Sequence, residues 1–228
     1  MKKFSINILL TLIYLGLSKS FSPSEQHSPY LIDKRVFSSF FTDAPIEVIL
    51  LDSFQTGFLI KTYFQKFKVF YGFKPPEIQI LRTSPEFWNK NIKNLGMSLF
   101  RRIKKDQPSN TTPMPPGALF IGNMSFGSWH LQNDGQKYWK FFRAYRHFPK
   151  NFSWKKFIPS YKFFTKMNIH LQHEQEFYGL NNEFGATGSI TKQTFKNTFD
   201  IANNNNIKVE IKTHFNKFFK TPVWKKEQ

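Results

Sequence analysis

The order of apolar and polar positions in residues 46–105 predicts two strands that alternate with two helices. Residues 46–51 form a short, nearly continuous apolar run with β-branched side chains, which is typical of a buried strand. Between residues 58 and 71, apolar side chains recur at spacings of three and four, which favours a helix. Residues 77–81 then indicate a second strand.

The second helix of this half is expected to begin beside Pro85. Thr83 or Ser84 supplies a side-chain oxygen for the N-cap, and proline in the first turn suits a helix start. Apolar positions continue this helix as far as a basic cluster of Arg101, Arg102, Lys104 and Lys105. The first half is therefore predicted as strand–helix–strand–helix.

A Pro-rich segment at residues 106–116 separates the two halves and is either a linker or a surface loop. The second half, residues 117–228, opens with a predicted strand at 117–122. Asn133-Asp134-Gly135 stands between two aromatic-rich runs, which is typical of a tight hairpin turn.

The rest of the second half predicts two helices and a strand. Ser160 is the expected N-cap of one helix, residues 191–199 indicate a short one, and residues 207–211 alternate like a strand. Together these elements predict an α+β (mixed α/β) fold, with a β-hairpin plus helices in the second half.

The first 20 residues have the organisation of a cleavable secretory signal peptide. Lys2 and Lys3 precede a mostly apolar run over residues 4–17, and small residues follow at the positions that a signal peptidase requires. A membrane anchor is the alternative, but this run is shorter than the ~20 apolar residues that span a bilayer. We therefore expect an exported protein, periplasmic or secreted, without a transmembrane span after cleavage. Residues 21–45 are expected to form an exposed lead-in.

Composition excludes several classes of site. The 228 residues contain no cysteine, which excludes disulfides, thiolate nucleophiles, Cys-ligated zinc and iron–sulfur clusters. Lys and Arg number 33 against 15 Asp and Glu, which gives a formal charge of +18. Such a chain attracts polyanions, but Lys, Phe, Asn and Ile all have A/T-rich codons, so a low-GC genome alone also enriches them. The position of the charges therefore matters more than their total.

The stretch from Gly135 to His173 is basic and aromatic and contains no acidic residue. A local positive field gathers anions, and aromatic faces beside it stack on sugar rings or bases. Arg143 and Arg146 are of most interest, because a guanidinium pairs well with carboxylate and phosphate. The expected binding residues are Lys137, Lys140, Arg143, Arg146, Lys155, Lys156, Trp139, Tyr145 and Trp154.

The alternative for this stretch is structural, with the aromatic side chains in the core and the lysines at its solvated edge. Our leading prediction is a non-catalytic binder of an anionic polymer or envelope surface, such as cell wall or lipopolysaccharide. Extracellular nucleic acid is a further candidate ligand, and no cofactor is expected.

The alternative function is a secreted hydrolase that acts on a cell-wall or other anionic polymer. Glu183 lies in a Gly-rich aromatic loop, and loops of this kind often carry sites. His147, His170 and His173 are the acid–base candidates beside it. His170 and His173 are also candidate metal ligands, but both precede Glu174, so the patterns of zinc proteases are not met. No catalytic motif is established.

Overall fold

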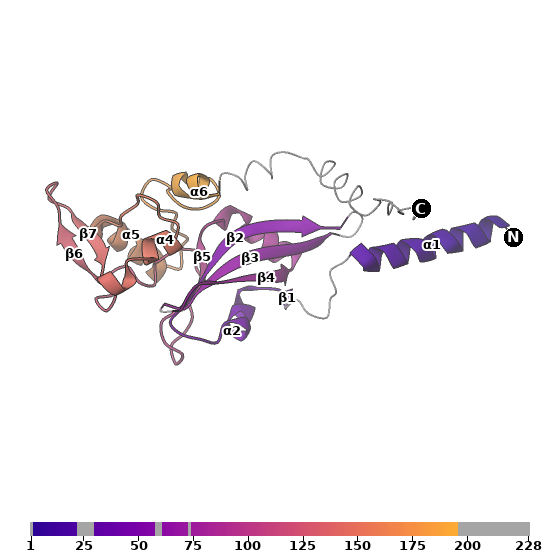
Figure 1. The fold of residues 1–228 in the computed structure, drawn as a ribbon, viewed down its shortest axis with the longest axis horizontal. Helices are drawn as coiled ribbons and strands as arrows, with labels where there is room; N and C mark the ends of the chain where they lie inside the picture. Colours follow the sequence, from indigo (N-terminus) through magenta and orange to yellow (C-terminus); the bar gives the residue numbers. More distant parts are fainter. Residues whose placement is uncertain (1, 22–29, 58–60, 73, 196–228) are drawn as a thin grey trace, which may run out of the picture. The chain divides into compact units, whose positions relative to one another are not determined.

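The computed structural model describes residues 2–21, 30–57, 61–72 and 74–195 (Figure 1). Residues 1–194 form one compact unit, which begins with helix α1 (Lys2–Phe21), and a second unit begins at Phe195. No helix in the described ranges combines the length and apolar character needed to cross a membrane. The predicted strand at 207–211 lies outside the described residues.

The largest element is a five-stranded sheet with the strand order β1-β4-β3-β2-β5. Only β1 and β4 pair in parallel, and the other pairs are antiparallel. The strands are β1 (Tyr30–Leu31), β2 (Ile46–Thr56), β3 (Thr62–Phe70), β4 (Glu77–Thr83) and β5 (Ser98–Arg102).

Short helices cover one face of this sheet with phenylalanine rings. The Phe37 ring lies 5.8 Å from Phe67 of β3, 5.7 Å from Phe87 and 5.5 Å from Phe100 of β5. Leu31, Phe37 and Phe41 are buried, so the expected exposed lead-in contributes core residues from Tyr30 onward. The helices are η1 (Lys34–Val36), α2 (Phe37–Phe40), α3 (Pro85–Asn91) and η2 (Ile92–Asn94).

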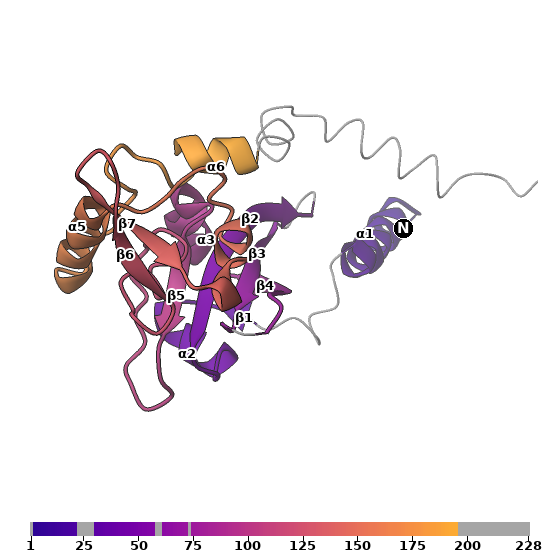
Figure 2. The same cartoon turned by 60° about the vertical axis from the view of Figure 1, so that its left-hand side comes forward.

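The second half of the unit packs against the opposite face of the sheet. Phe70 alternates with Phe67 across the pleat of β3, and its ring lies 4.9 Å from both Phe148 and Phe152 and 5.5 Å from Phe120. Figures 1 and 2 show these elements, which are β6 (Gly127–Leu131), β7 (Lys137–Phe141), η3 (Arg143–Tyr145), α4 (Phe148–Asn151), α5 (Tyr161–Gln172) and α6 (Ser189–Thr194).

The α+β fold is confirmed, as are the elements that local chemistry marks most clearly. β6 and β7 form the predicted hairpin, and its turn has Gly135 at φ +74°. Asp134 Oδ1 accepts the Gln136 N–H at 2.9 Å. The predicted caps are present, because Ser84 Oγ accepts the Phe87 N–H and Ser160 Oγ accepts the Phe163 N–H.

The helix predicted between residues 58 and 71 is wrong, because residues 62–70 form strand β3. This strand lies between β2 and β4, and elements cover both of its faces along part of its length. Apolar residues therefore occur on both faces, which removes the alternation that marks a half-buried strand.

Two further predictions are wrong, and in both cases glycines with positive φ explain the difference. The helix expected to reach Lys105 ends near Asn94, where Gly96 at φ +76° leads into β5. Residues 117–122 form turns and not a strand, with positive φ at Gly117 and Gly122. A Cβ at Gly117 would lie 2.5 Å from Trp154, so these turns also allow close packing.

The Pro-rich segment is held against the sheet. Ser98 and Met114 exchange backbone hydrogen bonds, and so do Arg101 and Asn110. Residues 112–117 are buried. This segment therefore continues the pairing beyond β5 and joins the sheet to the second half.

Candidate anion-binding surface

All nine Lys and Arg side chains between Gly135 and His173 are exposed. They come from β7, η3, α4, the turn after Trp154 and α5. None of them forms an ion pair with a residue in the described ranges, where Lys93 pairs with Glu176 and Lys105 with Asp43. We call this set the basic surface: Lys137, Lys140, Arg143, Arg146, Lys150, Lys155, Lys156, Lys162 and Lys166.

Arg143 is the first residue of η3 and Arg146 is its C-cap, so the 3₁₀ spacing places both on one side of the turn. A 3₁₀ helix has three residues per turn, so side chains three positions apart are eclipsed. Both arginines are exposed, and the Arg146 N–H donates to Arg143 O at 3.4 Å. This turn presents two planar guanidinium groups together, which suits a phosphate or carboxylate ligand.

The tryptophans of the expected binding face belong to the core. Trp139 is 3% exposed and Trp154 is 2% exposed. Trp154 Nε1 donates to Pro116 O at 2.9 Å, and its ring covers Gly117. Neither ring presents a face to a ligand, so both are withdrawn from the binding face. Tyr145 is half-buried, with its ring 4.9 Å from Phe126 and 5.1 Å from Phe148.

In the hairpin, the buried Trp139 and the exposed Lys140 lie on opposite faces, because side chains alternate along a strand. Trp139, Trp129 and Phe141 lie on the face that packs against other rings. Lys140 lies on the other face, where its neighbours across the ladder and along it are Ser128 and Tyr138. The alternation of β7 therefore places Lys140 opposite the packed rings, whereas Lys137 shares the face of Trp139 near the hairpin turn.

In the basic cluster near Lys105, three of the four side chains contact other parts of the unit. Arg101 is 4% exposed and donates to Ser98 O at 2.8 Å and to Asn110 Oδ1 at 2.7 Å. Arg102 donates to Phe41 O, and Lys105 pairs with Asp43. These side chains hold the end of β5 and the segment beside it.

Glu183 stabilises its own loop. Its Oε2 accepts the Asn181 N–H at 3.0 Å, and its Oε1 accepts from Asn181 Nδ2 at 3.2 Å. The carboxylate also lies over Gly179, where a Cβ would be 1.9 Å from Oε2. These contacts explain why residue 179 is a glycine, and they give Glu183 a structural role.

Among the described residues, none of the three histidines has a hydrogen bond or ring contact with Glu183. His147 is exposed beside the Phe148 ring, and His173 is the exposed C-cap of α5. His170 Nδ1 lies 3.1 Å from Glu176 O. Within the described ranges, no three His, Asp or Glu side chains are placed to hold a metal ion.

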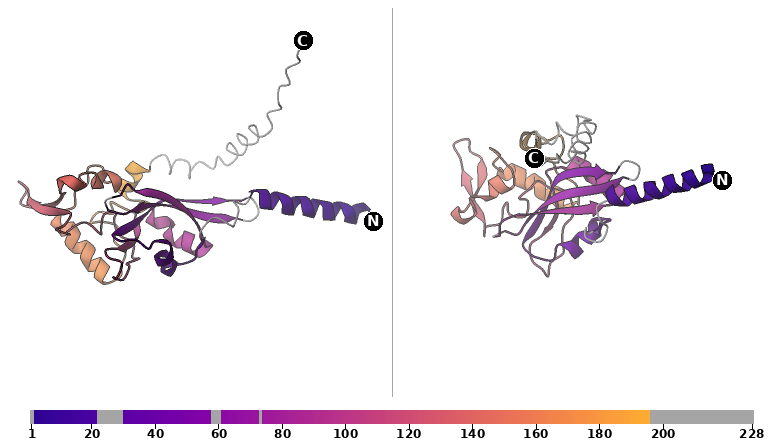
Figure 3. Two further views of the ribbon diagram at one scale, coloured as in Figure 1. Left: turned by 60° about the horizontal axis from the view of Figure 1, so that its bottom comes forward. Right: turned by 45° about the vertical axis from the view of Figure 1, so that its right-hand side comes forward.

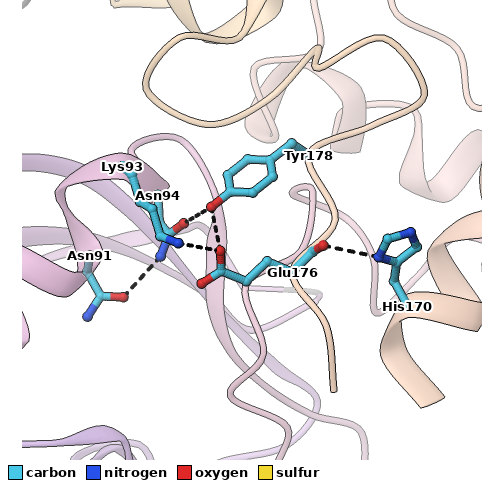
Figure 4. A network of polar contacts seen from close by, with 6 residues as sticks. All are labelled: Asn91, Lys93, Asn94, His170, Glu176 and Tyr178. Atoms are coloured by element: carbon cyan, nitrogen blue, oxygen red, sulfur yellow. Dashed lines mark hydrogen bonds and ion pairs between the residues drawn. The ribbon is translucent and has the colours of Figure 1, made fainter. Parts of the chain in front are cut away.

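Figure 4 shows a polar network that the sequence patterns did not reveal. Lys93 Nζ donates to Glu176 Oε2 at 2.7 Å, and the Tyr178 hydroxyl lies 2.7 Å from the same oxygen and 2.8 Å from Asn94 Oδ1. Burial raises the pKa of Glu176, but the hydrogen bonds from Lys93 and Tyr178 outweigh it and lower the pKa overall. Burial and the nearby Glu176 raise the pKa of Tyr178. The network ties η2 to the segment after α5.

A second unexpected feature is a buried carboxyl group between the sheet and the second half. Glu47 is fully buried on β2, opposite Arg101 of β5 in the ladder. Burial raises the pKa of Glu47 to about 7. Its Oε1 accepts the Gly117 N–H at 2.9 Å, whereas Oε2 has no hydrogen-bond partner among the described residues. The sequence signal was a glutamate inside the otherwise apolar run of residues 46–51.

No protein-family model, curated protein or solved structure matches this chain. Its function is therefore inferred from its own residues.

Proposed function

We propose that this protein is an exported, non-catalytic binder of an anionic polymer or envelope surface. The observation that carries the proposal is the basic surface, where nine cations are exposed without an acidic residue in the same stretch of chain. Unpaired exposed cations repel one another, and an anionic ligand relieves that repulsion. The exposed Lys and Arg side chains supply the contact with the anionic groups, and Trp139 and Trp154 take no part in it because they are buried.

The amino terminus supports export. Residues 4–17 have the apolar character of a signal peptide, and Leu9, Leu10 and Leu12 of α1 are 57%, 58% and 61% exposed. Removal of residues 1–20 takes away three lysines and no acid, so the expected mature chain stays strongly basic.

The experiment is co-sedimentation of residues 21–228, the expected product of cleavage, with purified cell-wall sacculi at low and high salt. The supernatant is assayed for released fragments. Binding without release, weakened by salt, is the expected result, because salt screens contacts between exposed charges. Binding that does not change with salt contradicts the ionic contact, and fragment release contradicts the absence of catalysis.

Two variants locate the binding groups. Arg143→Ala/Arg146→Ala removes the paired guanidinium groups from η3, and we expect a clear loss of pelleted protein. Glu183→Gln is the matched variant of the hydrolase alternative, and we expect it to bind like the unchanged protein. If Glu183→Gln lost binding and Arg143→Ala/Arg146→Ala kept it, the binding site would lie in the Gly-rich loop.

A further inference from the structure

Several large apolar side chains are exposed beside the basic surface. Leu131 near the hairpin turn is 70% exposed, and Ile158 and Tyr161 at the start of α5 are 52% and 51% exposed. Exposed apolar side chains that lie together and are rimmed by polar residues are typical of surfaces that meet an apolar partner. A hydrophilic polymer gives such groups little to contact.

The hairpin and α5 bring these side chains to one end of the unit. Leu131 and Trp129 lie on the same face of β6, and the Trp129 ring lies 5.2 Å from Tyr161 and 5.4 Å from Phe164. The Trp139 N–H donates to Pro159 O at 2.8 Å, which fixes the start of α5 beside β7. Figures 1 and 3 show β6, β7 and α5 together.

Lysines surround the apolar side chains. Lys137 is opposite Leu131 in the hairpin ladder, Lys162 follows Tyr161, and Lys166 lies one turn further along α5. All three are exposed. We call this set the hairpin–helix tip: Leu131, Lys137, Tyr161, Lys162 and Lys166.

This combination matches the interface of a lipid bilayer. Leucine and isoleucine gain from the acyl boundary, and tyrosine and tryptophan are favoured at headgroup depth. Each lysine near an acidic membrane surface adds about 1 kcal/mol of attraction. The same site thus offers apolar insertion and charge complementarity, whereas a soluble polyanion uses only the second.

We propose that the hairpin–helix tip binds peripherally to a bilayer that contains acidic phospholipids. This inference rests on the proposed function and specifies the anionic surface. Leu131 and Tyr161 enter the headgroup region, and Lys137, Lys162 and Lys166 contact the phosphates.

The test is flotation of residues 21–228 with phosphatidylcholine vesicles, with and without phosphatidylglycerol, and parallel binding to inorganic polyphosphate. We expect binding only to the acidic vesicles. Leu131→Ser/Tyr161→Ser should weaken vesicle binding at least about tenfold and leave polyphosphate binding unchanged. Leu131→Ser alone is the second variant, because a side chain that is 70% exposed contributes little to folding.

The matched control removes two equally exposed apolar side chains from β4. Ile78 and Ile80 are 50% and 49% exposed, so Ile78→Ser/Ile80→Ser changes surface hydrophobicity by a similar amount away from the tip. We expect this control to bind vesicles like the unchanged protein. An equal loss in the control overturns the placement at the tip.

Insertion has a direct readout in Leu131→Trp with lipids brominated along the acyl chain. Quenching of the new tryptophan supports insertion, and its absence overturns it. Binding to polyphosphate without binding to acidic vesicles overturns this inference and leaves the proposed function standing. Failure to bind either one, together with failure to bind sacculi, overturns both.

Discussion

Two regions of the unit can be compared, the sheet region (residues 30–102) and the basic stretch (residues 135–173). Both bury phenylalanine rings, but their charged side chains are located differently. Buried phenylalanine rings occur in both cores, beside Leu, Ile, Val and Met in the sheet region and beside two tryptophans in the basic stretch. The sheet region mixes six acidic with eleven basic residues, and it buries one of each, Glu47 and Arg101. The basic stretch has no acidic residue and keeps all nine cations exposed. Aromatic content therefore reports the core in both regions, and charge placement is what distinguishes the candidate binding surface.

The largest expected effect tests whether the rings of the basic stretch are core. Phe148 is fully buried, with its ring 4.9 Å from Phe70 and 5.0 Å from Phe120. Phe148→Ala leaves a cavity and should lower the free energy of unfolding by about 4 kcal/mol, measured by urea denaturation. Phe142→Ala is the control, because Phe142 is 44% exposed, and it should change stability by no more than about 0.5 kcal/mol. Similar losses in both variants would contradict the division into core and surface.

The next largest expected effect is a change of stability with pH, which the buried Glu47 carboxyl group of the sheet region causes. The pKa of Glu47 is raised from 4.5 to about 7, so between these values the folded protein holds a proton that the unfolded chain has released. The free energy of unfolding should therefore fall by about 3 kcal/mol as pH rises through this range.

Glu47→Gln isolates this contribution, since the amide keeps the shape and does not titrate. Urea denaturation at pH 5 and pH 8 should show a smaller decrease with pH for the variant than for the unchanged protein. If the free energy of unfolding changes with pH equally in both proteins, titration of the Glu47 carboxyl group does not affect stability.

The smallest effect concerns the ion pair of Lys93 with Glu176, where both side chains reach solvent. Glu176→Gln should cost about 0.5 kcal/mol at neutral pH, because exposed ion pairs contribute little. The pKa of Glu176 is lowered, so its contribution is present at neutral pH and is lost as the carboxylate is protonated in acid. The difference between variant and unchanged protein in urea denaturation should therefore shrink in acid. If the difference in stability grew in acid, the pKa of Glu176 would be raised in the folded protein and not lowered.

Local chemistry was enough to predict the elements whose signals lie within a few residues. Ser160 was predicted as a cap, Ser84 as one of two candidates with Thr83, and Asn133-Asp134-Gly135 as a turn. Each of these acts on backbone groups two or three positions away. Strand β3 was missed for the opposite reason. Its Lys68 is half-buried, with Nζ donating to Asn151 O at 2.9 Å, and that partner is far away in the sequence.

The candidate site was predictable only in part. The cations were found from composition, since lysine and arginine reach solvent in most contexts. The assignment of Trp139 and Trp154 failed because the sequence does not reveal which rings a fold buries. Glu176 and Tyr178 were missed because their partners, Lys93 and Asn94, come from the other half of the unit.

The central claim is that the location of the cations, and not the total charge, creates the binding surface. Lys140→Gln/Lys156→Gln/Lys166→Gln removes three exposed lysines from the basic surface, and Lys61→Gln/Lys74→Gln/Lys90→Gln removes three exposed lysines from the sheet region. Both variants lose the same charge.

The decisive measurement is the affinity of both variants for polyphosphate over a range of salt concentrations. We predict that only the basic-surface variant binds more weakly. The slope of its log affinity against log salt concentration should decrease in magnitude by about one for each lysine removed. An equal loss of affinity in the two variants would contradict the account, because binding would then follow net charge alone.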